Sequence, residues 1–295
     1  MDKSKPIQDI EDLKLEMQLI DKKFDSFYYN MLAVAMDYKS YIDPRIKNDS
    51  IYKIRNNIIF RLNGAKYHFE ILNNIVANLD SELTTAHRKV QQKGNLFGAD
   101  IILDQRILQV SYLSDSFFFH LGSGFDYISK LVEFVYSHNK DAEWKWTQLA
   151  RASRDEKNQF NKTSIASTID LLDREFIGKL YDHRSHLIHS KIDTSPSSFT
   201  INILEANCKA QIFSSQDFNR NFKELKTIAK ERNLTIRYSL LWVFNKSLTS
   251  LNTILFSLKE YMENNKKTDK LPMFIEGPNK EILPVSIKYW NKPNE

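Results

Sequence analysis

Residues 10–38 read IEDLKLEMQLIDKKFDSFYYNMLAVAMDY, and the fold class follows from this stretch. Its apolar residues are spaced alternately three and four positions apart: Ile10, Leu13, Met17, Ile20, Phe24, Phe27, Met31, Val34 and Tyr38. Such spacing places them along one side of a helix, so the stretch predicts a long α-helix with one buried face. Because a residue that precedes proline disfavours helical geometry, we expect this helix to end at Asp43-Pro44.

A second long helix is predicted to follow Asp49-Ser50, because either residue can cap a helix N-terminus. The apolar face of this helix comprises Ile51, Ile54, Ile58, Leu62, Ala65, Phe69, Leu72, Val76 and Leu79. We expect the two helices to form an antiparallel hairpin, and we assign residues 1–97 to this N-terminal helical hairpin layer. Gly94 and Gly98 then bracket a break in the helical pattern.

Residues 98–264 are predicted to form a helical core. One helix is expected to begin at Asp100 and to continue past Gly122 and Gly124 to Tyr136, and another to run from Ser164 to near Ser190. Residues 198–213 alternate apolar and polar side chains on either side of Ala206-Asn207, which predicts a small β-hairpin insertion.

After Gln216-Asp217 the sequence predicts two more helices. The second has an apolar face of Leu241, Phe244, Leu248, Leu251, Leu255, Leu258 and Met262. The remaining segment, residues 265–295, contains four of the seven prolines and is expected to be an extended tail. The predicted fold class is therefore all-α, with one small β-hairpin.

Composition excludes several classes of protein. Seven glycines and seven prolines among 295 residues are too few for sandwiches, barrels or Gly-rich phosphate loops, and the chain has no GxGxxG, Walker, HExxH, GxSxG or CxxC motif. The single cysteine, Cys208, allows no internal disulfide, which favours a reducing cytoplasm. The N-terminus does not resemble a secretory signal, and the apolar run between Lys246 and Lys259 is well short of the ~20 residues of a membrane span, so we expect no membrane association.

The chemistry-bearing stretch is LYDHRSHLIHS, residues 180–190, which contains three of the seven histidines and one arginine. Imidazole exchanges protons near neutral pH, and guanidinium carries a fixed charge in a geometry that fits phosphate. Together these groups suit phosphodiester chemistry that needs no metal. The net charge of +5 is compatible with a polyanionic partner.

Within this stretch, Arg184-Ser185-His186-Leu187-Ile188-His189 resembles the R-x4-H motif of the HEPN superfamily. The resemblance implies a HEPN-like helical bundle with Arg184 and His189 as the catalytic pair. It also implies supporting roles for Ser185, which stands where the family usually has Asn, Asp or His, for His186, and for Asp126 on an earlier helix, with Asp115 as the alternative acid.

The resemblance also implies an activity and partners. The resemblance implies a metal-independent endoribonuclease that cleaves single-stranded RNA through the ribose 2′-hydroxyl, with no cofactor and no metal, in a defence or toxin system. The expected partners are RNA, a second copy of the chain in a homodimer, and an antitoxin or other defence-system protein. The competing hypothesis is a non-catalytic HEPN-like module that binds nucleotides or RNA, or that dimerises.

The spacing of the catalytic pair raises a geometric problem. Arg184 and His189 are five residues apart, which corresponds to ~140° around an ideal helix and about 7.5 Å along it. A single active site therefore needs the helix to end or bend near His186, the arginine to reach around, or a second subunit to complete the site. The paired motif helices of the HEPN superfamily offer the simplest remedy, so the resemblance implies a homodimer.

Several of these side chains are also typical of purely structural or metal-binding roles. His183 falls on the apolar stripe and is expected to be a packed, hydrogen-bonded core residue. A structural ion pair with Asp126 or Asp182 would equally account for Arg184. His183, His186 and His189 could instead bind zinc. The aromatic run Phe117-Phe118-Phe119 could stack on bases, although such residues more often belong to a core.

Overall fold

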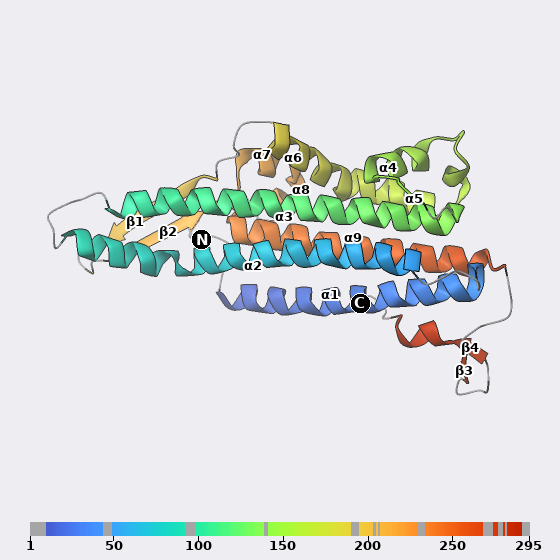
Figure 1. The fold of residues 1–295 in the computed structure, drawn as a ribbon. Coiled ribbons are helices and arrows are strands. Elements are labelled where there is room, and N and C mark those ends of the chain that lie inside the picture. Colours follow the sequence, from blue (N-terminus) through green and yellow to red (C-terminus); the bar gives the residue numbers. More distant parts are fainter. Residues whose placement is uncertain are drawn as a thin grey trace. The chain divides into compact units, whose positions relative to one another are not determined.

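A computed structural model describes residues 10–43, 49–91, 98–138, 141–189, 195–202, 205, 207–228, 234–267, 274–276, 280 and 282–290. The expected break at Gly94, the helix end at Ser190 and the hairpin turn at Ala206 lie outside these residues. The described part of the chain is mostly helical, and the two small sheets are two-stranded antiparallel hairpins. The predicted all-α class with a small β-hairpin is therefore confirmed (Figure 1).

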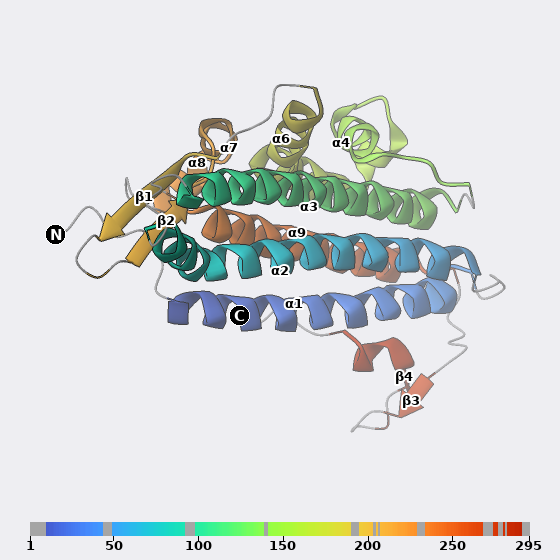
Figure 2. The ribbon, with the colours of Figure 1, turned by 60° about the vertical axis from the view of Figure 1, so that its left-hand side comes forward.

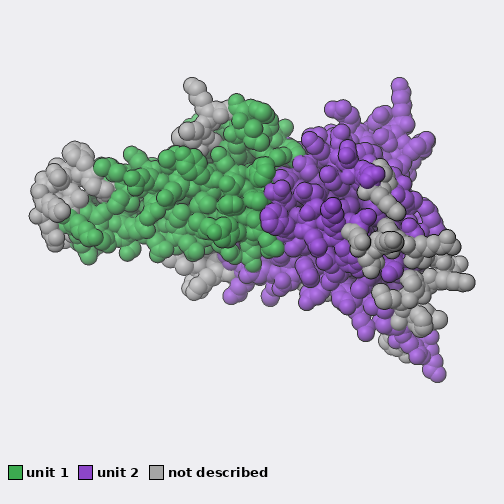
Figure 3. Space-filling model, viewed as in Figure 1, with its two compact units in different colours: residues 1–16, 63–120, 179–243 green, residues 17–62, 121–178, 244–295 purple. Residues whose placement is uncertain are grey.

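The chain divides into two compact units, and each unit collects segments that are distant in the sequence (Figure 3). Unit 1 comprises residues 1–16, 63–120 and 179–243, and unit 2 comprises residues 17–62, 121–178 and 244–295. Four long helices contribute residues to both units: α1 (Ile10–Asp37), α2 (Asp49–Gln91), α3 (Gly98–Ser137) and α9 (Ile236–Asn264). The division into residues 1–97, 98–264 and 265–295 stays a prediction.

Unit 2 contains most of the first predicted helix. The part of α1 that begins at residue 17 runs antiparallel to the first part of α2 (Figures 1 and 2). The predicted stripe is buried here, as the exposure of Ile20, Phe27, Met31, Val34 and Tyr38 is 1% or less. The helix changes to a π turn at Tyr38–Ile42, and the backbone of Asp43, with φ −140° and ψ 90°, is no longer helical, so the helix ends before Pro44 as predicted.

The shorter elements of unit 2 follow α3 and α9. They are α4 (Trp146–Arg154), a 3₁₀ turn (Gln159–Lys162), α5 (Ser164–Leu172) and a π turn (Asp173–Ile177). In the tail, strands β3 (Phe274–Glu276) and β4 (Ile282–Pro284) form a second small hairpin, and a 3₁₀ turn (Val285–Lys288) follows it. The tail thus has some regular structure that the sequence pattern does not predict.

The tail of unit 2 is held by a buried carboxylate. Asp37, which is 1% exposed, accepts a hydrogen bond of 2.8 Å from the indole N–H of Trp290. Burial raises the pKa of Asp37 to about 6, although the hydrogen bonds from Ser286 and Trp290 act in the opposite direction. The ring of Trp290 also packs against Phe256 of α9.

Unit 1 contains the remaining helices and the predicted hairpin. The helices are α6 (Gly178–His189, of which residue 178 belongs to unit 2), α7 (Gln216–Asn221) and α8 (Lys223–Ile228). Strands β1 (Ser197–Asn202) and β2 (Asn207–Ile212) pair antiparallel, from Ser197 opposite Ile212 to Asn202 opposite Asn207. The hairpin is anchored to α2, where Asp80 accepts the backbone N–H of Ala210 at 2.9 Å and Thr84 that of Cys208 at 3.0 Å.

Two expected helices differ in detail from the structure. The helix expected from Ser164 to near Ser190 comprises α5, the π turn and α6, because a π turn accommodates an extra residue without ending the helix. The helix expected after Gln216-Asp217 is split at Phe222 into α7 and α8. Among the described helices, none combines the length and the apolar composition that a membrane span requires.

Candidate functional site

Helix α6 carries the motif residues on regular helical geometry. The π turn at Asp173–Ile177 precedes it, and the α-helix then continues without interruption from Gly178 through His189. The helix therefore does not end near His186, which removes one of the three ways to bring Arg184 and His189 together. The two side chains point in directions that differ by ~140°.

His183 occupies the interior side of α6. The residue is 2% exposed, and its ring centroid lies 4.6 Å from that of Phe118, 5.4 Å from Phe218 and 5.8 Å from Phe222. The amide of Asn221 lies 3.3 Å from the ring Nδ1 and donates to it. Burial lowers the pKa of His183 to about 4, so the ring is neutral at pH 7. The prediction of a packed, hydrogen-bonded core histidine is confirmed.

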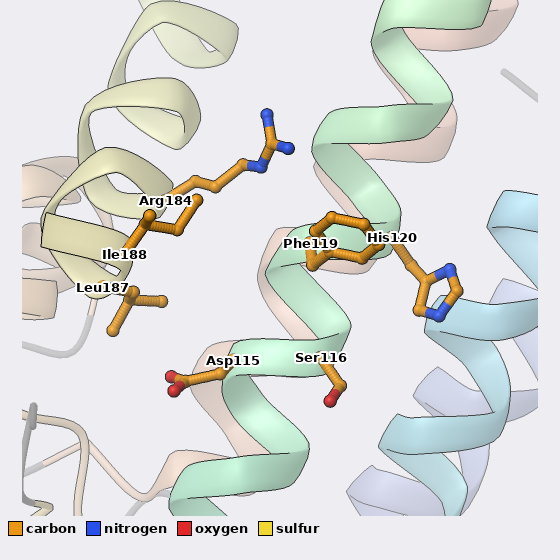
Figure 4. A pocket seen from close by; sticks show the side chains of 7 residues that line it. All are labelled: Asp115, Ser116, Phe119, His120, Arg184, Leu187 and Ile188. Carbon is orange, nitrogen blue, oxygen red and sulfur yellow. The ribbon is translucent and has the colours of Figure 1, made fainter.

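Arg184, the next residue, lies at the wall of a pocket of about 350 Å³ (Figure 4). Helix α6 contributes Arg184, Leu187 and Ile188 to the pocket, and α3 contributes Asp115, Ser116, Phe119 and His120. The guanidinium carbon lies 5.5 Å from the ring centroid of Phe119 and 5.8 Å from that of Tyr181. These cation–π contacts position a fixed positive charge beside the pocket.

The α3 side of the pocket has two parts. Figure 4 shows the Asp115 side chain directed toward α6, whereas His120 is directed toward α2, with Phe119 between Arg184 and His120. On α2, the ring of His68 stacks on that of His120, with centroids 5.3 Å apart and planes at 26°. Burial lowers the pKa of His68.

Gly64, one helical turn before His68, makes room for the imidazole of His120. A Cβ atom at residue 64 would lie 2.6 Å from both Cε1 and Nδ1 of His120, which is closer than non-bonded atoms approach. A glycine inside a helix costs about 1 kcal/mol relative to alanine. The position of the His120 ring explains why a glycine, rather than a better helix former, occupies position 64.

The other motif residues lie outside the pocket lining. Ser185 and His189 are exposed, and His189 is the last described residue of α6. His186 Nε2 lies 3.1 Å from a carboxylate oxygen of Asp217 on α7, and Arg220 lies 3.4 Å from the other oxygen. His186 therefore belongs to a small surface charge cluster with α7.

The two candidate acids have different positions. Asp126 belongs to unit 2, where its Oδ1 accepts the backbone N–H of Trp146, the first residue of α4, at 3.1 Å. Asp115, the alternative acid, lines the pocket together with Arg184. Of the two, Asp115 is the carboxylate that shares a described pocket with the arginine.

A zinc site made of the three motif histidines is not supported. His183 is enclosed by phenylalanine rings, while His186 contacts Asp217. Within the described parts of the chain, no three His, Cys, Asp or Glu side chains gather as metal ligands.

Sequence reasoning missed Ser116 and His120 and left Phe119 out of the site. Within Phe117-Phe118-Phe119, the first two rings are buried and the third is 45% exposed, a difference that the run of identical residues does not reveal. Two signals were available: Gly64 in the middle of a predicted helix, because an interior glycine indicates close packing, and the helical spacing that aligns Phe119 with Asp115 and Asp126 rather than with the apolar face.

Comparisons with protein families, curated proteins and solved structures find no match to this chain.

Proposed function

We propose that this chain is an endoribonuclease that cleaves single-stranded RNA without a metal ion, and that Arg184 and His189 are its catalytic pair. The observation that carries the proposal is the placement of Arg184, whose guanidinium is positioned by Phe119 and Tyr181 at an accessible pocket. A fixed cation in such a position suits a phosphate group that gains charge during reaction.

In the proposed reaction, the ribose 2′-oxygen attacks the adjacent phosphorus and the bond from phosphorus to the 5′-oxygen breaks. His189 either takes the proton of the 2′-hydroxyl or gives a proton to the departing 5′-oxygen, and water exchanges the other proton. Arg184 stabilises the additional negative charge of the five-coordinate phosphorus. The products are a 2′,3′-cyclic phosphate and a free 5′-hydroxyl, and DNA is not a substrate because it lacks the 2′-hydroxyl.

The proposed active site contains residues of two copies of the chain. Because α6 is regular through His189, the exposed imidazole points away from the pocket that Arg184 lines. In a symmetric dimer, Arg184 of one copy and His189 of the other can meet at one phosphate, and the symmetry generates two such sites. The defence or toxin context and a partner protein remain part of the proposal.

A complementation experiment tests the shared site. Arg184→Ala and His189→Ala chains with different tags are co-expressed, and heterodimers are purified through both tags. Each variant alone should be inactive, whereas the heterodimer retains one intact site of two and should have about half of the wild-type activity. Strictly monomeric wild-type protein in light scattering, or an inactive heterodimer, would contradict the shared site.

The competing function is RNA binding without cleavage, and a specific observation favours it: His189 does not line the pocket. A protein of this kind would bind a single-stranded oligonucleotide and leave it intact in EDTA over long incubation. Cleavage that is lost in the His189→Ala variant would exclude this alternative.

A further inference from the structure

A continuous series of aromatic contacts crosses unit 1 from α2 to α6. We call it the aromatic strip, and its members are Tyr67, His68, His120, Phe119, Arg184 and Tyr181. The ring centroids of successive members are 5.5, 5.3 and 5.6 Å apart from Tyr67 to Phe119. Arg184 continues the series, because its guanidinium carbon lies 5.5 Å from the ring of Phe119 and 5.8 Å from that of Tyr181.

The aromatic strip lies at the surface rather than in the core. Tyr67 is 60% exposed and Phe119 is 45% exposed, whereas Phe117 and Phe118 on the same helix as Phe119 are buried. The remaining members are half-buried. Figure 4 shows Arg184, Phe119 and His120 in this order between α6 and the α2 side. The strip therefore offers partly exposed rings in a row across three helices.

The middle of the strip depends on an unusual sequence choice. The glycine at position 64 leaves space for the His120 ring, which any larger residue would displace. That ring contacts His68 on one helix and Phe119 on its own helix, so it joins the α2 part of the strip to the α3 part. Gly64 weakens its helix, but it leaves the space in which the His120 ring makes the strip continuous.

We infer that the aromatic strip binds single-stranded RNA, with bases stacked on Phe119 and Tyr67 and a phosphate beside Arg184 in the pocket. Naming RNA as the strand rests on the proposed function. Proteins bind single strands without sequence preference by stacking bases on aromatic rings, because every base has a face that can stack. Positively charged side chains in the same groove bind the phosphates of the nucleic acid. The fixed charge of Arg184 and the net charge of +5 complement a polyanion.

Binding is measured separately from cleavage. The probe is a fluorescent 2′-O-methyl oligouridine, which lacks the 2′-hydroxyl nucleophile and so cannot be cleaved by the proposed reaction. Fluorescence anisotropy should give about tenfold weaker binding for Phe119→Ala and for Tyr67→Ala, because each removes one stacking surface. Phe119→Tyr keeps an aromatic ring and should bind within about twofold of wild type.

The matched control is Tyr29→Ala. Tyr29 lies on α1 in unit 2 and is 45% exposed, as Phe119 is, whereas every member of the strip belongs to unit 1, so its removal should leave the affinity unchanged. The proteins should unfold at similar temperatures, because all three tyrosine or phenylalanine side chains are exposed.

The outcomes separate the strip from the nuclease. Wild-type protein that binds the probe through the strip but does not cleave unmodified RNA would contradict the proposed function and support the strip. Cleavage by wild type, together with unchanged binding in Phe119→Ala and Tyr67→Ala, would overturn the strip and leave the nuclease standing. A loss of self-association in these variants, with unchanged probe binding, would instead identify the strip as a protein interface and overturn the inference.

Discussion

His183 and Arg184 are neighbours in the sequence, yet they lie in opposite environments on α6. The imidazole of His183 is enclosed by three phenylalanine rings, and burial keeps it neutral. The guanidinium of Arg184 lies at a pocket wall, where one partner ring is itself exposed. The difference follows from helix geometry, since a single step along the helix rotates the side chain by ~100°. The His183 side of α6, its inner side, supports the fold. Arg184 at the pocket and the exposed His189, ~140° away from it around the helix, both point away from that inner side, and we call the part of the helix that carries them the outer side.

The greatest change is expected in cleavage, and it belongs to the outer side of α6. Arg184→Ala and His189→Ala should each lower the rate of RNA cleavage by about 10³-fold, because one removes stabilisation of the charged transition state and the other a proton-transfer group. Chemical denaturation should show only a small change in stability for His189→Ala, whose side chain is exposed. Cleavage at the wild-type rate in either variant would show that the substituted residue is not catalytic.

The inner side of α6 should contribute to the pH dependence of stability through His183. The unfolded chain protonates His183 near pH 6.5 and the folded chain only near pH 4, so protonation favours unfolding. The contribution of His183 to the free energy of unfolding should therefore fall by up to ~3 kcal/mol as pH drops from 6.5 to 4. His183→Phe should abolish this contribution, which urea titrations at several pH values would measure.

Asp37 in unit 2 provides a comparison of the opposite sign. Its folded-state pKa of about 6 lies above the ordinary value of 3.8, so the stability linked to its protonation is present below pH 3.8 and is lost as pH rises through 6. With rising pH, Asp37→Asn should therefore remove a destabilising trend, whereas His183→Phe should remove a stabilising one. Parallel pH profiles for the two variants would contradict these assignments.

Truncation of His183 should reduce stability more than it reduces activity. His183→Ala removes the ring contacts with Phe118, Phe218 and Phe222 and the hydrogen bond from Asn221. We expect a loss of about 1–3 kcal/mol in the free energy of unfolding, with near-normal cleavage well below the melting temperature. A His183→Ala variant that is as stable as wild type but inactive would show that His183 has a catalytic role rather than a structural one.

The smallest change is expected at the back of the pocket, where Gly64 meets His120. Gly64→Ala gains about 1 kcal/mol of helix propensity but forces the His120 ring to move. In the wild-type background these two effects should largely cancel, whereas in a His120→Ala background the same substitution should stabilise by about 1 kcal/mol. Thermal unfolding of the four proteins in this double-mutant cycle gives the coupling. Equal effects in both backgrounds would show that Gly64 does not serve His120.

The long helices could be predicted from the sequence because their apolar residues recur every three or four positions. The buried stripe from Ile20 to Tyr38 and the start of α3 near Asp100 agree with that pattern. The β1–β2 hairpin could be predicted from a different pattern, the alternation of apolar and polar residues. The π turns at residues 38–42 and 173–177 did not follow, because an extra residue in one turn leaves the surrounding spacing intact.

The pocket could be predicted only in part. Arg184 could be predicted because the arginine and the histidines of the motif lie within one short segment, where their residue types alone indicate phosphodiester chemistry. The contact of Arg184 with Phe119 and the stacking of His120 on His68 each join segments that are far apart in the chain. The spacing of residues within one segment therefore cannot predict these contacts. The buried Phe118 and the exposed Phe119 are distinguished by the wider helical spacing, because Phe118 lies on the same face as Leu121 and Phe125, whereas Phe119 lies on the face of Asp115 and Asp126.

If the outer side of α6 cleaves RNA by metal-free acid–base chemistry, the products of the reaction should reveal it. The decisive assay incubates the purified protein with single-stranded RNA and, separately, with DNA of the same sequence, both in EDTA, and identifies product ends by mass spectrometry. We expect RNA fragments that end in 2′,3′-cyclic phosphate, intact DNA, and no cleavage by the His189→Ala variant. Cleavage that requires added metal, or that cuts DNA equally well, would contradict the proposed chemistry.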